Sequence, residues 1–153
     1  MKHTFISQNL DVTMKLGARL AELLNIGDTL LLKGDLGAGK TTITKGIALG
    51  LKISEKVNSP TFNIMKIYLR GTKPLFHIDA YRLENNFDDI GLDEFIGTEG
   101  ISVIEWPQYI GHLLPEIYLE IVIKHLNLDQ REITLIGEGR YESVVKTLAE
   151  EFK

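Results

Sequence analysis

Residues 29–42 of this 153-residue chain have the sequence TLLLKGDLGAGKTT, and they decide its fold. The apolar run at 29–33 has the length of a strand. Ile43, Ile47 and Leu51 follow at helical spacing. Between these elements, residues 34–41 fit the pattern G-x-x-x-x-G-K-[ST], the Walker A phosphate loop. That motif requires a preceding strand and a following helix, and the sequence predicts both.

The chemistry of this loop predicts a site for a nucleoside triphosphate. Glycines let successive backbone N–H groups turn towards a phosphate, and the helix presents its positive N-terminal end to the same anion. We expect Lys40, on a solvent-facing loop, to reach the β- and γ-phosphates and the Thr41 hydroxyl to ligate Mg²⁺. The residues expected to bind nucleotide are Gly34, Asp35, Leu36, Gly37, Ala38, Gly39, Lys40, Thr41 and Thr42.

Two carboxylates are placed to complete a metal site. Asp79 follows the mostly apolar residues 75–78, and Glu105 follows the apolar residues 101–104. In open α/β sheets, ligands bind beside the carboxyl ends of the strands. The catalytic candidates are therefore Lys40, Asp79 and Glu105, and the metal candidates are Thr41, Asp79 and Glu105. Either carboxylate could instead cap a helix or end a strand in solvent, and His77 is expected to pack or to form a hydrogen bond.

A short segment after the predicted helix is a candidate switch. Residues 59–62, SPTF, lie where many phosphate-loop proteins carry a mobile segment that senses the γ-phosphate. Ser59 and Thr61 are its switch-like residues. A Ser-Pro turn that leads into a strand accounts for the same residues equally well.

The remaining elements predict one domain over residues 1–153. Helices are expected at 9–25, 85–96 and 141–152, and strands at 62–69, 74–78, 101–105, 117–124 and 132–136. Helices alternate with strands early in the chain, and hairpins enter later. This order predicts an α/β, P-loop NTPase-like three-layer fold with a mixed, mostly parallel sheet flanked by helices.

Composition excludes several classes of function. Lys and Arg total 17 and Asp and Glu total 21, for a net charge of −4, and 44% of residues are hydrophobic. No apolar run approaches the 18 or more residues of a membrane span, so no membrane partner is expected. The chain has no cysteine, which excludes disulfides, thiolate nucleophiles and cysteine zinc sites. Without an export signal, the expected location is the cytoplasm.

Charge is distributed unevenly along the chain. Residues 33–73 contain eight Lys or Arg and two carboxylates, whereas residues 83–123 contain nine carboxylates and no Lys or Arg. Two interpretations stay open. The segments form two solvated faces of opposite sign, or the basic segment binds phosphates or a partner and the acidic one repels nucleic acid.

Four segments in this order resemble the TsaE family, formerly YjeE, of bacterial ATPases required for threonylcarbamoyladenosine modification of tRNA. They are GDLGAGKTT at 34–42, SPTF at 59–62, HIDAYR at 77–82 and IEWP at 104–107. The phosphate loop is shared by many families, whereas the other three segments are specific in combination. The resemblance extends from about Thr13 to about Arg131, which is most of the chain.

The resemblance implies a phosphate-loop ATPase that is weak alone and uses ATP and Mg²⁺. It implies TsaB and TsaD as partners: TsaD transfers the threonylcarbamoyl group to adenosine 37, and the ATPase allows turnover. It also implies that tRNA is reached through the complex and not by strong direct binding. Thr13 corresponds to a region near the nucleotide, and Thr61 lies in the switch-like segment.

Three other classes stay open. A small GTPase would carry an Asn-Lys-x-Asp element, which is missing, so adenine is the expected base. A small-metabolite or nucleoside kinase shares the phosphate loop but usually adds an arginine-rich lid, whereas the arginines here are dispersed along the sequence. A non-catalytic nucleotide-sensing or tRNA-binding module is compatible with the basic segment.

Overall fold

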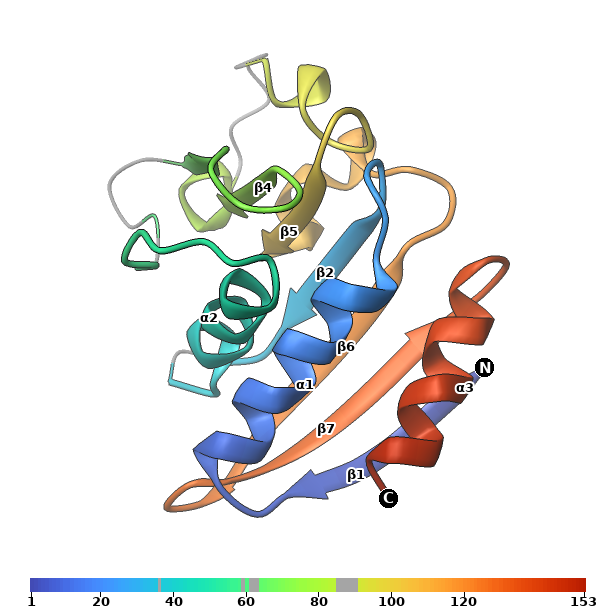
Figure 1. Cartoon of the computed structure of the whole chain (residues 1–153). Coiled ribbons are helices and arrows are strands. Elements are labelled where there is room, and N and C mark those ends of the chain that lie inside the picture. Colours follow the sequence, from blue (N-terminus) through green and yellow to red (C-terminus); the bar gives the residue numbers. More distant parts are fainter. Residues whose placement is uncertain (36, 59, 61–63, 85–90) are drawn as a thin grey trace.

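The computed structural model describes residues 1–35, 37–58, 60, 64–84 and 91–153. Within these residues, seven strands form one sheet (Figure 1). In chain order the strands are β1 (Lys2–Ser7), β2 (Thr29–Lys33), β3 (Met65–Tyr68), β4 (Leu75–Asp79), β5 (Ile101–Glu105), β6 (Leu119–Asn127) and β7 (Gln130–Gly137). The helices of the same residues are α1 (Leu10–Leu23), α2 (Lys40–Gly50) and α3 (Tyr141–Glu151), with 3₁₀ segments η1 (Tyr81–Leu83), η2 (Leu92–Glu94) and η3 (Pro107–Leu113).

The strand directions confirm the predicted mixed, mostly parallel sheet. The strand order is β1-β7-β6-β2-β5-β4-β3. Four adjacent strands, β6, β2, β5 and β4, run parallel to one another. Strand β7 runs antiparallel to both β6 and β1, and β3 runs antiparallel to β4. Five of the seven strands therefore point in one direction, and the ends of β2, β4 and β5 meet at one edge.

The sheet separates two hydrophobic cores. Leu30 and Leu32 of β2 belong to one core and Leu31 to the other, as alternation along a strand requires. Buried residues of α1, α2 and α3 complete the first core, and these helices cover that face of the sheet (Figure 1). On the second face, residues of the 3₁₀ segments, among them Leu83 and Leu92, close the core. The described part of the chain thus has the predicted three layers, with a 3₁₀ layer on the second face.

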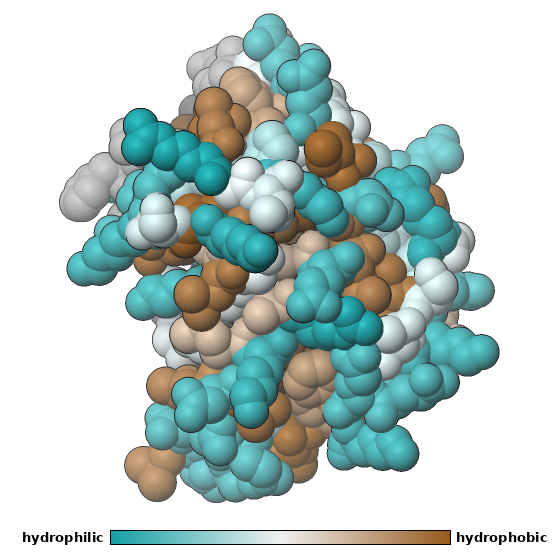
Figure 2. Space-filling model, viewed as in Figure 1, coloured by the Kyte–Doolittle hydropathy of each residue, from teal (hydrophilic) through white to brown (hydrophobic). Residues whose placement is uncertain are grey.

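The outer surface of the helical layer has a mixed character. Figure 2 shows hydrophobic residues scattered among hydrophilic ones on this face. Leu49 of α2 and Ile26 after α1 are among the exposed hydrophobic side chains. In the described ranges, no helix is both long and apolar enough to cross a bilayer.

Helix α2 is held in place by a close contact with α1. A Cβ atom on Gly17 of α1 would lie 2.3 Å from the Ile43 carbonyl oxygen, and one on Gly46 of α2 would lie 2.2 Å from the Met14 carbonyl oxygen. Real Cβ atoms do not approach backbone this closely, so both positions require glycine. Because α2 begins directly after the phosphate loop, this contact also fixes the loop.

Gly46→Ala is expected to lower the free energy of unfolding by about 1–3 kcal/mol, because the added methyl group forces the two helices apart. Urea denaturation measures the change. Gly111→Ala is the matched control, since a Cβ there has no neighbour within 4 Å. If Gly46→Ala is no less stable than Gly111→Ala, the helix contact does not have the importance given to it here.

The carboxyl-terminal helix, for which the sequence offered no motif, is anchored to the start of β2. The Tyr141 hydroxyl donates to the Asp28 carboxylate at 3.1 Å and accepts from the Thr29 N–H at 3.0 Å. Arg140 Nε donates to the same carboxylate at 2.9 Å. Burial raises the pKa of the Tyr141 hydroxyl, which keeps it a neutral donor. The network fixes the strand that leads into the phosphate loop.

Three features differ from the sequence-based expectations. The helix expected over residues 85–96 is wrong where it is described, because residues 91–96 contain only η2 and Gly91 has a left-handed φ of 81°. Residues 85–90, 62 and 63 lie outside the described residues. Strand β3 begins at Met65, within the expected strand. Strand β1 was not predicted, and it forms through pairing with the distant β7 rather than through a local pattern.

Candidate functional site

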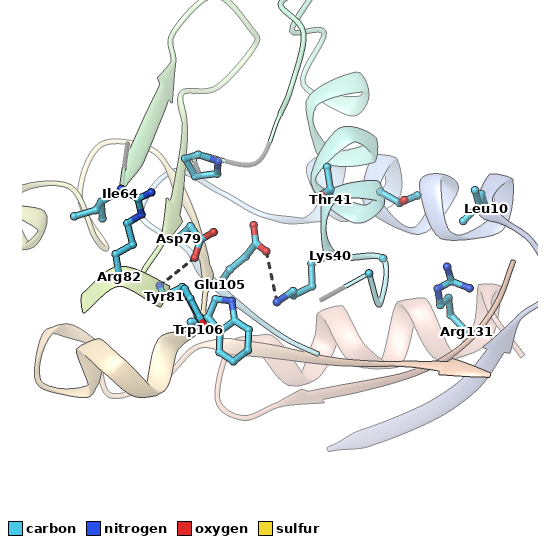
Figure 3. Close-up of a pocket in the computed structure, with 14 residues that line it drawn as sticks. Leu10, Lys40, Thr41, Ile64, Asp79, Tyr81, Arg82, Glu105, Trp106 and Arg131 are labelled. Carbon is cyan, nitrogen blue, oxygen red and sulfur yellow. Dashed lines mark hydrogen bonds and ion pairs between the residues drawn. The ribbon is translucent and has the colours of Figure 1, made fainter. Parts of the chain in front are cut away.

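A cavity of about 690 Å³ lies at the edge where β2, β4 and β5 end. This volume is typical of a small-molecule site. Figure 3 shows side chains from both sides of the cavity, with Lys40 between them. Seven predicted residues line it: Gly37, Gly39, Lys40, Thr41, Thr42, Asp79 and Glu105. The other lining residues are Leu10, Pro60, Ile64, Tyr81, Arg82, Trp106 and Arg131.

The glycines of the phosphate loop allow its shape. Gly37 and Gly39 have φ values of 79° and 114°, in the region that side chains with a Cβ avoid. Gly39 is the N-cap of α2, and no side chain caps the helix there. The first N–H groups of α2 therefore have no side-chain acceptor at this cap, which suits an anion.

Lys40 is buried, so the expectation of a solvent-facing position is wrong. Its side chain is 6% exposed, and its Nζ lies 3.8 Å from Glu105 Oε1. The same Nζ lies 4.4 Å from the centroid of the Trp106 ring. A buried ammonium requires a paired charge, and Glu105 supplies it. Replacing Lys40 therefore also leaves a buried carboxylate without its cation.

The two predicted carboxylates lie side by side. Asp79 and Glu105 are register partners on the parallel strands β4 and β5. Glu105 is 3% exposed, and its second oxygen, Oε2, lies 2.6 Å from His77 Nε2. Asp79 is more accessible, and its Oδ1 accepts from the Tyr81 N–H at 3.1 Å. The sheet thus brings together the two carboxylates that the sequence singled out.

The residues of the cavity fit Mg²⁺ only where phosphate oxygens of a bound ligand complete its coordination. Thr41, Asp79 and Glu105 offer a hydroxyl and two carboxylates, which are the hard oxygen ligands that Mg²⁺ prefers. Within the described residues, no group of three or more His, Cys, Asp or Glu could hold a metal. Because Mg²⁺ is usually held by one or two carboxylates together with phosphate oxygens, this donor set matches a metal that arrives with a triphosphate.

Other predicted residues have different surroundings. Thr13 is fully buried, and its hydroxyl lies 2.7 Å from Ser7 Oγ, so it supports the start of α1 while Leu10 lines the cavity. Gly34 packs against β6, where a Cβ would lie 2.8 Å from the Ile123 carbonyl oxygen. Asp35 lies in a neighbouring hollow, and the Ala38 carbonyl faces β7. Leu36, Ser59 and Thr61 lie outside the described residues, and their roles stay predictions.

Arg131 of β7 supports the phosphate loop, a role that the sequence analysis missed. Its Nε donates to the Ala38 carbonyl at 2.8 Å, and its Nη1 donates to the carbonyls of Leu128 and Gln130 at 2.8 and 3.0 Å. The side chain is nearly buried and lines the cavity. A basic residue at an inward position of an alternating strand was the available signal.

The fold and this cavity define a protein of the phosphate-loop class. The chain belongs to the TsaE family: a family model described as "Threonylcarbamoyl adenosine biosynthesis protein TsaE" matches residues 7–133. This result confirms the resemblance inferred from the four sequence segments.

Individual relatives agree with this assignment. The chain is 46% identical over 142 residues to the tRNA threonylcarbamoyladenosine biosynthesis protein TsaE of Bacillus subtilis, covering 92% of this chain and 90% of the relative. It is 39% identical over 132 residues to the TsaE protein of Treponema pallidum, covering 85% and 97%. The crystal structure of YdiB from Bacillus subtilis superposes with a TM-score of 0.84 at 38% identity, covering 99% of this chain and 96% of that one.

Arg131→Gln is expected to speed amide hydrogen exchange in residues 37–40 on the order of tenfold, because lost charged hydrogen bonds to carbonyls cost about 1.5–3 kcal/mol. Hydrogen–deuterium exchange with mass spectrometry measures the rate. Arg70→Gln is the matched control, since that side chain is exposed beyond the end of β3 and outside the phosphate loop and its supports. Equal exchange in the two variants would contradict a role for Arg131 in holding the loop.

Proposed function

We propose that this chain binds ATP with Mg²⁺ in the cavity and hydrolyses it as one component of the machinery that makes threonylcarbamoyladenosine at adenosine 37 of tRNA. The observation that carries the proposal is the buried pair of Lys40 and Glu105 beside the phosphate loop, 3.8 Å apart, in a chain of the TsaE family. One domain, residues 1–153, carries the whole site.

Lys40 is the residue that a triphosphate recruits. The phosphates bring concentrated negative charge to the start of α2, where no side chain caps the helix. Lys40 then leaves Glu105 for the β- and γ-phosphates, while loop N–H groups bind the same anion. The ammonium exchanges one anionic partner for another, so it is never buried unpaired.

The carboxylates have separate roles in hydrolysis. Once Lys40 has moved, Oε1 of Glu105 faces the cavity, and with the Thr41 hydroxyl it would hold Mg²⁺. An ion held by these two residues would neutralise charge on the phosphate oxygens. Asp79, more accessible and beside Glu105 in register, orients the attacking water. Glu105 is the residue for metal positioning because its surroundings are the more fixed.

The arginines of the cavity favour slow hydrolysis over phosphoryl transfer to a metabolite. Arg82 and Arg131 both line the cavity, but Figure 3 places them on opposite sides of Lys40. Arg131 already donates to three backbone carbonyls. This arrangement lacks the cluster with which a kinase lid surrounds the transferred phosphate, so the ATPase hypothesis is preferred to the kinase hypothesis.

Partner proteins complete the activity. We place the chain in the cytoplasm with TsaB and TsaD, where ATP hydrolysis allows repeated cycles of modification. The acidic segment 83–123 disfavours direct contact with tRNA, so tRNA is reached through the complex. The basic segment 33–73, which contains the phosphate loop, is a better candidate than the acidic segment for docking TsaB and TsaD.

Nucleotide binding is tested first, through the single tryptophan. Trp106 lies against the Lys40 ammonium, so recruitment of Lys40 by ATP and Mg²⁺ is expected to change its fluorescence. Titrations with ATP and GTP under the same Mg²⁺ are compared, and tighter binding of ATP is expected because the sequence lacks a guanine-recognition element. Tighter binding of GTP would favour a GTPase.

The role in tRNA modification is tested by reconstitution with TsaB, TsaD, tRNA and the threonylcarbamoyl-adenylate donor. Lys40→Gln is expected to reduce multiple-turnover yield to the level without added protein. Lys146→Gln, on the exposed face of α3 and outside the basic segment 33–73, is the matched control and should retain the wild-type yield. Thermal unfolding of Lys40→Gln and of Lys40→Gln/Glu105→Gln separates lost chemistry from the destabilising effect of an unpaired Glu105.

Equal yields with wild type, with Lys40→Gln and with no added protein would refute the proposed role. Rapid phosphorylation of a small metabolite by the isolated chain would place the kinase hypothesis first.

A further inference from the structure

His77 is a fully buried histidine that contacts Glu105, a residue of the cavity wall. It lies in the middle of β4, and it does not line the cavity itself. Its Nε2 is 2.6 Å from Glu105 Oε2, while the other oxygen of that carboxylate is 3.8 Å from Lys40 Nζ. Each oxygen of the Glu105 carboxylate therefore has its own partner: the imidazole of His77 contacts Oε2, and the ammonium of Lys40, which lines the cavity, contacts Oε1.

The hydrogen bonds define which form of His77 is present. A carboxylate oxygen only accepts hydrogen bonds, so His77 Nε2 carries the proton and donates a hydrogen bond to Glu105 Oε2. The other ring nitrogen, Nδ1, is buried and has no hydrogen-bond partner in the described structure. A second N–H at Nδ1 would be buried without an acceptor, so the neutral ring protonated at Nε2 fits the site. Lys40 is then the cation that balances the charge of Glu105, whereas the hydrogen bond from His77 orients the Glu105 carboxylate.

The parallel pairing of β4 with β5 explains why the His77 ring meets the Glu105 carboxylate. His77 is in register with Val103, and Asp79 is in register with Glu105. His77 and Glu105 are thus diagonal neighbours on one face of the sheet. Because His77 is completely buried, the close packing around its ring opposes a change of rotamer.

We propose that His77 is a positioning residue for Glu105, and that its Nε2–H fixes Oε2 so that Oε1 alone faces the cavity. Oε1 receives Lys40 in the nucleotide-free protein and is presented to Mg²⁺ when the triphosphate has recruited Lys40. This inference rests on the proposed function. Without His77, the carboxylate rotates, offers both oxygens to Lys40 and loses its alignment towards the metal.

The test compares three replacements of His77. His77→Gln carries an amide N–H at the distance of Nε2, His77→Asn carries one too short to reach Glu105, and His77→Leu carries none. Ile78→Val is the matched control, because Ile78 is the next residue of β4, equally buried, and packs in the opposite core. It reports the effect of weakened packing alone.

Two quantities are measured on each folded variant. One is ATP affinity in EDTA, from Trp106 fluorescence, which tests the phosphate loop without metal. The other is the Mg²⁺ concentration at half-saturation of the fluorescence change with ATP present. His77→Leu and His77→Asn are expected to keep ATP affinity in EDTA within about twofold and to raise the Mg²⁺ half-saturation about tenfold or more, as loss of a ligand's hydrogen-bond partner does. His77→Gln and Ile78→Val are expected to stay near wild type.

The outcomes separate the two proposals. If wild type binds no ATP, the proposed function fails. If wild type binds ATP and Mg²⁺ but His77→Asn has the wild-type Mg²⁺ half-saturation, or His77→Gln loses as much as His77→Asn, His77 does not position Glu105. If His77→Leu does not fold, the Gln and Asn variants decide the question alone.

Discussion

A buried ion pair governs the design of this molecule. The side chains of Lys40 and Glu105 are 6% and 5% exposed, and their charged atoms lie 3.8 Å apart. Removing two charges from water is costly unless they are paired, so the start of α2 and the end of β5 must be held at a fixed separation. The pairing of β2 with β5 sets this separation from one side, and the glycine contact between α1 and α2 sets it from the other.

The same constraint gives meaning to two residues outside the motif. Arg131 fixes the loop backbone through the Ala38 carbonyl, and His77 fixes the far oxygen of Glu105. Neither is a ligand of the triphosphate in this account. Arg131 holds the loop backbone two residues before Lys40, and His77 holds Glu105, so in the proposed exchange the lysine changes its partner while the loop and the carboxylate stay in place.

The sequence predicted the parts of the site that depend on local patterns. The strand, loop and helix around Lys40 and the two strands that end in Asp79 and Glu105 all form where expected. Their meeting in one cavity follows from parallel pairing, which places strand ends at one edge. The burial of Lys40, the role of Arg131 and the identity of Glu105 as the hydrogen-bond partner of His77 were not predicted, because each depends on contacts between residues distant in sequence. Strand β1 was missed for the same reason, and the expected helix at 85–96 was wrong at Gly91 and η2.

We propose that Lys40 exchanges Glu105 for the triphosphate while His77 keeps Glu105 in place. A crystal structure of the protein with Mg²⁺ and a non-hydrolysable ATP analogue tests it most directly. We expect Lys40 Nζ within hydrogen-bond distance of the β- and γ-phosphate oxygens, with the bond between His77 Nε2 and Glu105 Oε2 intact. A structure in which Lys40 stays on Glu105 with the nucleotide bound, or in which Glu105 has turned away from His77, would contradict it.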